Sequence, residues 1–355
     1  MHPFVFEIAR LRVISGRGSR TRITAEVEAI GCQRVLVIAS PSHAGTAAQV
    51  HQLLGPRSVG VYDKVAQHVP TPFVEACTAV VRRDSVDGLI AIGGGSAIGL
   101  AKAIALESGL PFIAVPTTYS GSEMTAVWGI TTDGVKKTGK DQRVLARSVI
   151  YDSELLTTLK ARTAGPSGLN ALAHLVEGLY APNANPMMST LGQEGARVIA
   201  RSLPAVCANP GDLDAQDKML YGSCLAGILL GSTGMSLHHK LCHTLGGSFN
   251  MPHAETHAVV LPYATAFNLV AAPDAQARLA ASFGTSAVAQ AIWELGAKVG
   301  APRSLRDIGF KHEDLDRAAQ IATSVPYPNP RPVTQAAIRQ LLEDAFNGQS
   351  PESRS

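Results

Sequence analysis

Residues 88–96 read Gly-Leu-Ile-Ala-Ile-Gly-Gly-Gly-Ser and join two different local patterns. The first five form a short apolar run, which is typical of a strand covered on both faces of a sheet. Residues 97–106 are mostly alanine, leucine and isoleucine, and they favour a helix. Glycines between a buried strand and a helix let a phosphate approach the backbone and the positive end of the helix dipole. The stretch therefore predicts an α/β fold with a phosphate site at this turn.

Three more apolar runs predict strands in the same half of the chain. They cover residues 34–40, 58–62 and 111–115, and helical segments that begin near Ser42 and cover 72–83 separate them. Strands that alternate with helices indicate a mostly parallel, doubly wound sheet, whose ligands bind at the carboxyl ends of the strands. We expect an N-terminal dinucleotide-binding domain of this kind.

The second half of the chain has a different periodicity. After Asp152 the β-type runs disappear, and helical spacing covers residues 167–180, 187–203, 213–235, 255–271, 274–299, 312–324 and 334–346. A chain of 355 residues is long for a single core. We therefore expect two domains, an α/β domain at 1–155 and an all-helical domain at 156–355.

The composition excludes several classes of protein. The chain is 46% apolar and 17% charged with a net charge of +3, and no basic run is interleaved with aromatic residues, so a nucleic-acid partner is not expected. The N-terminal residues lack a signal-peptide pattern, and apolar segments are interrupted before the roughly 20 residues of a membrane span. The five cysteines show no C-x-x-C spacing, which favours reduced thiols in a cytoplasmic protein without a membrane partner.

The glycine turn and the loop after the next strand form the candidate cofactor site. The turn departs from G-x-G-x-x-G at Ile98, but residues 115–125 add several hydroxyl groups at a strand end, where they can bond a pyrophosphate or a ribose. A carboxylate at the end of the first strand would favour NADH over NADPH, and Ser40 stands there instead. We predict that NADH or NADPH contacts Ser40, Gly93, Gly94, Gly95, Ser96, Thr117, Thr118, Ser122 and Thr125. A basic segment at 132–147 is expected to be a solvated hairpin or loop.

Five of the eleven histidines lie between Ser236 and His257. His239 and His243 are four residues apart, so they share one face of a helix, and Gly246, Gly247 and Pro252 are expected to break the helix and return His253 toward them. In the 167–180 helix, polar residues recur on one face at Asn170, His174 and Glu177. Because buried polar groups need partners, we expect this face to meet the histidines.

These motifs together resemble the iron-containing alcohol dehydrogenase family. The resemblance rests on residues 93–96, Pro-Thr-Thr at 116–118 with Gly-Ser-Glu at 121–123, the 168–178 helix, and His239-x-x-x-His-x-Leu-Gly-Gly with Pro252-His253. It implies a dehydroquinate synthase-like fold, with an N-terminal dinucleotide-binding domain, an all-helical C-terminal domain and an active site in the cleft between them. It also implies a homodimer.

The resemblance assigns site residues by motif position. The divalent metal of the family is held by one Asp and three His, and these positions correspond here to Asn170, His174, His239 and His253. His243 corresponds to the unligated histidine near nicotinamide and substrate. Asn offers a neutral carbonyl in place of an anionic oxygen, so we expect no metal at this site.

The sequence around Asn170, the segment 247–257 and the Pro-Asn-Pro-Arg-Pro turn at 328–332 are similar to one branch of the family, the maleylacetate reductases. This branch reduces the carbon–carbon double bond of maleylacetate, a dicarboxylate enone, to 3-oxoadipate with NADH or NADPH in the breakdown of aromatic compounds. The resemblance implies catalytic roles for His243, His253, His174, His239 and Asn170. Tyr119, His257 and Arg331 are the candidate substrate-binding residues, with Arg331 able to clamp a carboxylate.

Three other functions remain open at this point. A metal-dependent alcohol dehydrogenase that tolerates Asn170 would bind metal stoichiometrically. A lyase of the dehydroquinate synthase type would use NAD without net consumption of NADH. A non-catalytic nucleotide-binding protein would bind NADH without turnover.

Overall fold

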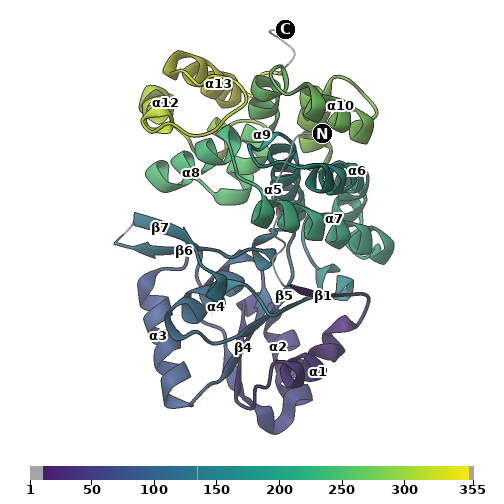
Figure 1. Ribbon diagram of the computed structural model, residues 1–355, viewed down its shortest axis with the longest axis vertical. Helices are drawn as coiled ribbons and strands as arrows, with labels where there is room; N and C mark the ends of the chain where they lie inside the picture. The colour runs from purple at the N-terminus through teal and green to yellow at the C-terminus, as the bar shows by residue number, and fades with distance from the viewer. Residues whose placement is uncertain (1–10, 134, 352–355) are drawn as a thin grey trace. The chain divides into compact units, whose positions relative to one another are not determined.

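The computed structural model describes residues 11–133 and 135–351 of the chain. These residues form two compact units, one that ends at Thr158 and one that begins at Leu159 (Figure 1). The predicted boundary at residue 155 lies in a short 3-10 helix, Ser153–Leu156, at the end of the first unit. The first ten residues, on which the expectation about a signal peptide rests, lie outside the described ranges.

The first unit contains a six-stranded sheet in which every neighbouring pair of strands is parallel. Its spatial order is β1 (Arg12–Ser15), β8 (Ser148–Tyr151), β5 (Phe112–Pro116), β4 (Gly88–Gly93), β2 (Val35–Ala39) and β3 (Ser58–Tyr62). The four predicted strands are β2, β3, β4 and β5. Strands β1 and β8 were not predicted, because each has only four residues and β1 has an exposed edge pattern instead of a buried apolar run.

Helices cover both faces of this sheet, as the doubly wound prediction requires. The helices are α1 (Ile23–Ala29), α2 (Ala44–Leu54), α3 (Thr71–Arg83) and α4 (Gly95–Ser108). Residues of α1 and α2 form one core cluster with alternate residues of β2, β4 and β5, and Figure 1 shows α3 and α4 on the other side of the strands. The basic segment forms a hairpin of β6 (Val127–Thr132) and β7 (Val135–Lys140), which begins five residues before the predicted range.

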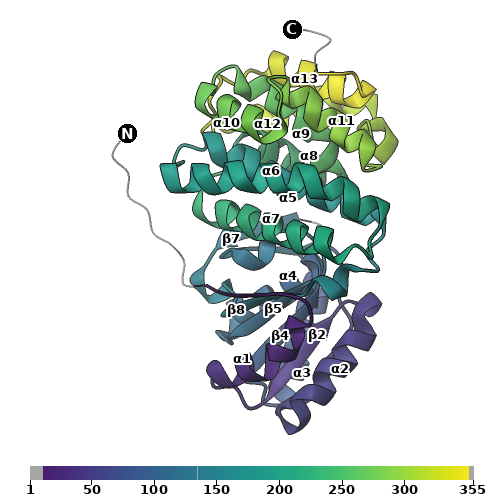
Figure 2. The same ribbon diagram turned by 90° about the vertical axis from the view of Figure 1, so that its right-hand side faces the viewer.

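The second unit is all-helical in its described part. Its helices are α5 (Ala161–Tyr180), α6 (Pro186–Ala208), α7 (Leu213–Ser232), α8 (Leu237–Phe249), α9 (His253–Leu269), α10 (Pro273–Phe283), α11 (Val288–Lys298), α12 (Leu315–Thr323) and α13 (Gln335–Asn347). Helix α5 is buried from Ala164 to Leu179 and packs against α6, α7 and α9 (Figure 2). A helix buried on every side needs a partner for each of its polar side chains, and this requirement shapes the site.

Two helix predictions are corrected by the structure. The segment 274–299 forms two helices, because Gly284 takes a left-handed conformation that ends α10. Gly246 and Gly247 do not break α8, which continues to Phe249 and ends at Asn250 with a φ of 54°. Leu237, Leu241 and Leu245 anchor α8 in a core cluster, and this burial outweighs the roughly 1 kcal/mol that each helical glycine costs.

Within the described residues, no helix on its own has both the length and the apolar character needed to cross a membrane; α7 and α8 meet the criterion only as a pair bent by 91°. The five cysteines are free thiols, and Cys32, Cys77 and Cys242 are buried.

Candidate functional site

The turn between β4 and α4 brings together residues from three strand ends. Gly93 has a φ of 149°, which favours glycine, and a Cβ there would lie 2.5 Å from Oγ of Ser40. A Cβ on Gly94 would lie 3.0 Å from Cγ2 of Thr118, whereas the space beside Gly95 is open. Because Gly93 and Gly94 have no side chains, Ser40 and Thr118 can lie directly against the turn.

The N-terminus of α4 provides the chemistry of this turn. Gly94 is its N-cap residue and offers no side-chain acceptor, and the first bond of the helix runs from the Ile98 amide to the Gly94 carbonyl oxygen. The amides of Gly95 and Ser96 precede that bond, so they have no partner within the helix. Free amides at the positive end of a helix dipole, next to open space, can bind a phosphate group.

Part of the predicted cofactor loop faces the protein interior instead. Thr117 is buried and its amide bonds the Gly93 carbonyl oxygen, while Ser122 is half-buried. Thr125 and Tyr119 are fully buried, and Oγ1 of Thr125 accepts a hydrogen bond from Nζ of Lys102. Both side chains therefore lie in the interior in this conformation, and Oγ1 of Thr125 is already bonded to Lys102. The contacts of Thr125 with cofactor and of Tyr119 with substrate stay predictions.

Lys102 is a residue that the sequence analysis missed. It is 1% exposed inside α4, and its Nζ donates to the carbonyl oxygens of Ser122, Thr125 and Val127 at 2.6, 2.8 and 2.7 Å. Burial lowers the pKa of Lys102 to about 7, and the charge of buried Glu123 opposes this shift. The sequence signal for this residue is that Lys102 is the one charged residue in the otherwise apolar helix predicted at 97–106. Lys102 fixes the loop that follows β5.

Three helices of the second unit bring six histidines together. Ring centroids lie 4.9 Å apart for His174 and His239, 4.9 Å for His239 and His257, 4.4 Å for His253 and His257, and 6.0 Å for His239 and His243. The sixth member is His238, which the sequence analysis left out although it adjoins His239 in the motif. His174, His238, His239 and His257 are buried, whereas His243 and His253 are exposed. The structure thus gathers all five predicted histidines.

Glu177 of α5 anchors this cluster by binding the start of α8. Its buried carboxylate accepts hydrogen bonds from the amides of Ser236 and His238 at 3.2 and 2.7 Å, and from Nδ1 of His239 at 2.6 Å. A negative charge at a helix N-terminus is stabilised by the helix dipole. Nδ1 of His239 donates to Glu177, and its Nε2 is buried with no hydrogen-bond partner in the described chain.

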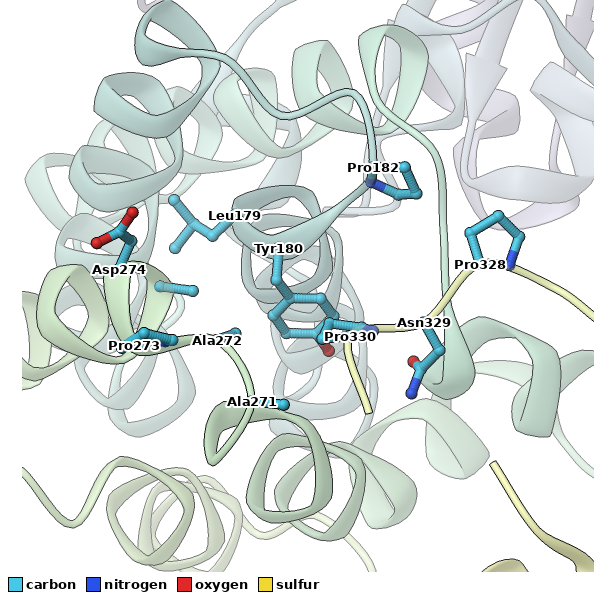
Figure 3. Close-up of a pocket in the computed structure, with 11 residues that line it drawn as sticks. Leu179, Tyr180, Pro182, Ala271, Ala272, Pro273, Asp274, Pro328, Asn329 and Pro330 are labelled. Carbon is cyan, nitrogen blue, oxygen red and sulfur yellow. The ribbon is translucent and has the colours of Figure 1, made fainter. Parts of the chain in front are cut away.

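Asn329, in the Pro-Asn-Pro-Arg-Pro turn, also bonds the start of α8. Its Oδ1 accepts from the amide of Leu237 at 3.3 Å and from Nδ2 of Asn268, and its Nδ2 donates to Oδ1 of Asn268 at 2.7 Å. Figure 3 shows Asn329 beside Tyr180 in a pocket that residues 271–275 also line. The pocket lining contains none of the six histidines. Asn329 is therefore the residue of this turn that bonds the start of α8.

Arg331 of the same turn lies elsewhere. Its guanidinium stacks over the ring of Phe267 at 4.3 Å, near the C-terminal end of α9. Phe267 follows His253 by fourteen positions in that helix, which at 1.5 Å per residue separates them by about 20 Å. Arg331 therefore lies far from His253 along α9 in this conformation, and its role as a carboxylate clamp stays a prediction.

Three of the buried histidines, His174, His238 and His257, are held neutral by their burial. Burial lowers the pKa of His174, His238 and His257 well below the usual value, and the neighbouring histidines lower it further. Neutral imidazoles expose lone pairs, which suits proton transfer, hydrogen bonding or metal binding.

Comparison with known proteins decides the family. Residues 11–153 match the family described as iron-containing alcohol dehydrogenase, and residues 165–346 match the C-terminal domain of the Fe-containing alcohol dehydrogenase family. The chain belongs to the iron-containing alcohol dehydrogenase family. Within it, the chain is 48% identical over 349 residues to the maleylacetate reductase of Pseudomonas sp. (strain P51), with 98% of this chain and 99% of that protein covered.

Two further proteins are similar to this chain over nearly their full length. The maleylacetate reductase of Burkholderia cepacia is 46% identical over 351 residues, covering 99% of this chain and 100% of that protein. The crystal structure of maleylacetate reductase from Agrobacterium tumefaciens superposes with a TM-score of 0.95 at 43% identity, covering 99% and 100% of the two chains. The predicted fold class and family are confirmed.

The name of the iron-containing alcohol dehydrogenases implies a metal, and the residues at its ligand positions do not fit one. Asn170 provides a neutral amide oxygen where the family has a carboxylate, and Glu177 already accepts bonds from α8. Among the described residues, one trio of His, Cys, Asp or Glu has its ligand atoms within 4.8 Å of one another, and it is His238, Cys242 and His257, not His174, His239 and His253. The donor set at the family's ligand positions therefore lacks the negative charge that a hard divalent ion prefers.

Proposed function

We propose that this protein is a maleylacetate reductase that uses NADH or NADPH to convert maleylacetate into 3-oxoadipate. The observation that carries the proposal is the donor set, in which a neutral amide, Asn170, replaces the family's acidic ligand beside the clustered histidines. The full-length similarity to proteins named maleylacetate reductase supports the same substrate. The proposed reaction therefore has to proceed with Asn170 and the histidines as its polar groups.

The chemistry of the substrate explains how a neutral site can suffice. Reduction of an isolated carbonyl concentrates charge on one oxygen, which a Lewis-acid metal stabilises by several kcal/mol. Maleylacetate is an enone, so hydride from nicotinamide C4 can add to the carbon β to the ketone. The developing charge then spreads over an enolate, which ordinary hydrogen-bond donors can hold. We propose that the enzyme works without a metal.

The histidines supply the remaining steps of the proposed reaction. His243 and His253 are the exposed members of the cluster, and we propose that they donate hydrogen bonds to the enolate oxygen. One of them then gives a proton to the carbon next to the carbonyl, which completes the addition of one hydride and one proton across the double bond. His174 and His239 hold the substrate from the buried side, and Glu177 fixes the orientation of His239.

The cofactor assignment rests on the glycine turn. The N-terminus of α4 binds the pyrophosphate of NADH or NADPH, with Ser40, Ser96 and Thr118 around it. Ser40 introduces no carboxylate that would repel the additional phosphate of NADPH, so both cofactors are accepted. A homodimer in the cytoplasm completes the proposal and rests on the family resemblance.

One experiment tests the function and its metal independence together. NADH absorbance is followed after maleylacetate is added to purified protein, once as prepared and once after exhaustive treatment with chelator. Equal rates support a reductase without a metal. Activity that disappears with chelator and returns with a divalent ion supports a metal-dependent member of the family, and no NADH oxidation in either sample contradicts the proposal.

A further inference from the structure

A group of side chains of the kinds that can bind metals lies beside the proposed catalytic histidines. His238 and Cys242 are on α8 and His257 is on α9, and all three are buried. Nε2 of His238 is 3.0 Å from Nδ1 of His257 and 3.6 Å from Sγ of Cys242. His238 and Cys242 have no role in the proposed reaction, and His257, which was expected to contact substrate, is fully buried.

Two of the three separations between these atoms are close to those of ligands around one ion, and all three lie within 4.8 Å. Thiophilic ions bind imidazole nitrogen at roughly 2.0–2.1 Å and thiolate sulfur at about 2.3 Å. With angles between tetrahedral and trigonal, this gives about 3.3–3.6 Å between two nitrogens and about 3.5–3.8 Å between nitrogen and sulfur. The observed 3.0 and 3.6 Å differ from these values by only a few tenths of an ångström for the nitrogen pair and not at all for the sulfur contact.

The fold holds the three ligands in place before any ion arrives. His238 and Cys242 are four residues apart, so they project from the same face of α8. Helices α8 and α9 pack against each other, and Leu241, Leu245 and Val260 surround the contact in one core cluster. Because the ligands are already ordered, binding an ion costs little conformational entropy.

We infer that His238, Cys242 and His257 form a binding site for a monovalent thiophilic ion, Cu(I). The thiolate is a soft ligand that favours Cu(I) among a few thiophilic metals, and imidazole is a ligand that copper also accepts. Cys242 is 2% exposed in an apolar core cluster, where an unpaired thiolate would be costly, so the apo site holds a neutral thiol. Exchange of its proton for Cu⁺ leaves the charge of the buried site unchanged, whereas a divalent ion adds one uncompensated charge.

The proton balance of binding follows from the hydrogen-bonding pattern. The S–H bond of Cys242 breaks, an S–Cu bond forms, and one proton passes to the solvent. In the apo pair one imidazole donates its N–H to the other, and in the bound state the hydrogens lie on Nδ1 of His238 and Nε2 of His257. Both atoms are buried without a hydrogen-bond partner in the described part of the chain. The oxidation state of copper does not change.

The test is an anaerobic titration of the reduced full-length protein with Cu(I) against the competing chelator bathocuproine disulfonate. We expect one Cu(I) per chain and one proton released per ion. Cys242→Ser should lose this binding, and Cys207→Ser, which removes a half-buried thiol on α6, should retain it. Circular dichroism of both variants checks that they fold alike.

A second measurement identifies the ligands directly. X-ray absorption at the copper edge should report one sulfur and two nitrogen neighbours in the wild-type protein. Copper retained equally by Cys242→Ser, a sulfur-free copper environment, or one Zn²⁺ held by the same residues in preference to Cu(I) would each overturn the inference. Because no substrate or cofactor is added, this outcome is independent of the proposed reductase activity.

Discussion

The carboxylate of Glu177 accepts a 2.6 Å hydrogen bond from Nδ1 of His239, although the two residues lie 62 positions apart in the chain. The same carboxylate binds two amides at the start of α8. A single side chain of α5 therefore sets both the position of the site helix and the tautomer of its first motif histidine.

Replacement of Glu177 by Gln should reduce both stability and turnover. Hydrogen bonds to a charged group contribute about 1.5–3 kcal/mol each, and the amide nitrogen of Gln cannot accept from α8. We expect a loss of about 2–4 kcal/mol in the free energy of unfolding and a decrease in kcat of about 10- to 100-fold. Urea denaturation and steady-state kinetics measure the two effects. Glu294→Gln, on the exposed face of α11, is the control, and an equal effect there would contradict this role.

The Pro-Asn-Pro-Arg-Pro turn should act through Asn329, not through Arg331. Asn329→Ala removes the acceptor of the Leu237 amide and leaves the Asn268 side chain without its partner. We expect a loss of about 1–3 kcal/mol in stability and a lower kcat. Arg331→Gln should leave the KM for maleylacetate within about twofold, since surface changes of this kind are usually small. A large rise of KM in Arg331→Gln with normal Asn329→Ala kinetics would reverse the assignment.

The buried histidines predict that the protein loses stability in mild acid. Their pKa values are lowered by folding, so below the unfolded pKa of about 6.5 the unfolded chain binds more protons than the folded chain. The free energy of unfolding should then fall as pH decreases below about 6.5, by up to about 1.4 kcal/mol per pH unit for each such histidine.

Urea denaturation of the wild-type protein and of His238→Gln between pH 5 and 7.5 tests this dependence. The difference between the two slopes isolates one histidine and removes the contributions of other groups, including Glu123. Identical slopes would show that His238 does not titrate on unfolding.

Asn170→Asp should give the site a divalent metal that the wild-type protein does not require. Oδ1 of Asn170 is buried and has no hydrogen-bond partner among the described residues, so a carboxylate there gains its partner from an ion near His174 and His239. We expect stoichiometric Fe²⁺ or Mn²⁺ after dialysis of the variant, measured by elemental analysis. Asn250→Asp adds the same charge at an exposed position, and equal metal in both variants would contradict the prediction.

Two glycines of the β4–α4 turn should respond differently to alanine. Gly93→Ala places a Cβ 2.5 Å from Ser40 in a backbone conformation that alanine rarely adopts, and we expect about 1–3 kcal/mol of destabilisation. Gly95→Ala meets open space, so stability should be unchanged while the KM for NADH rises because the methyl group enters the phosphate site. Thermal denaturation and cofactor titration separate the two, and an unchanged KM in Gly95→Ala would move the phosphate away from this turn.

The amino-acid sequence by itself determined the elements that depend on neighbouring residues. Apolar runs predicted β2, β3, β4 and β5, and the glycines at 93–95 placed the phosphate turn, because strand burial and backbone freedom are local properties. The spacing of the histidines and the motifs around them are also local, and they indicated the family. These signals lie within short stretches of the chain.

Tertiary structure alone decided which side chains work together. Glu177, Asn329 and Lys102 each bind groups that are 20 or more positions away, and no periodicity reports such pairs. Thr125 and Tyr119 lie in a loop that reads as polar, yet the fold buries them. Arg331 and Asn329 are two residues apart in one turn, but only Asn329 contacts α8. Burial and long-range hydrogen bonds depend on how the helices pack, so only the folded chain distinguishes these residues.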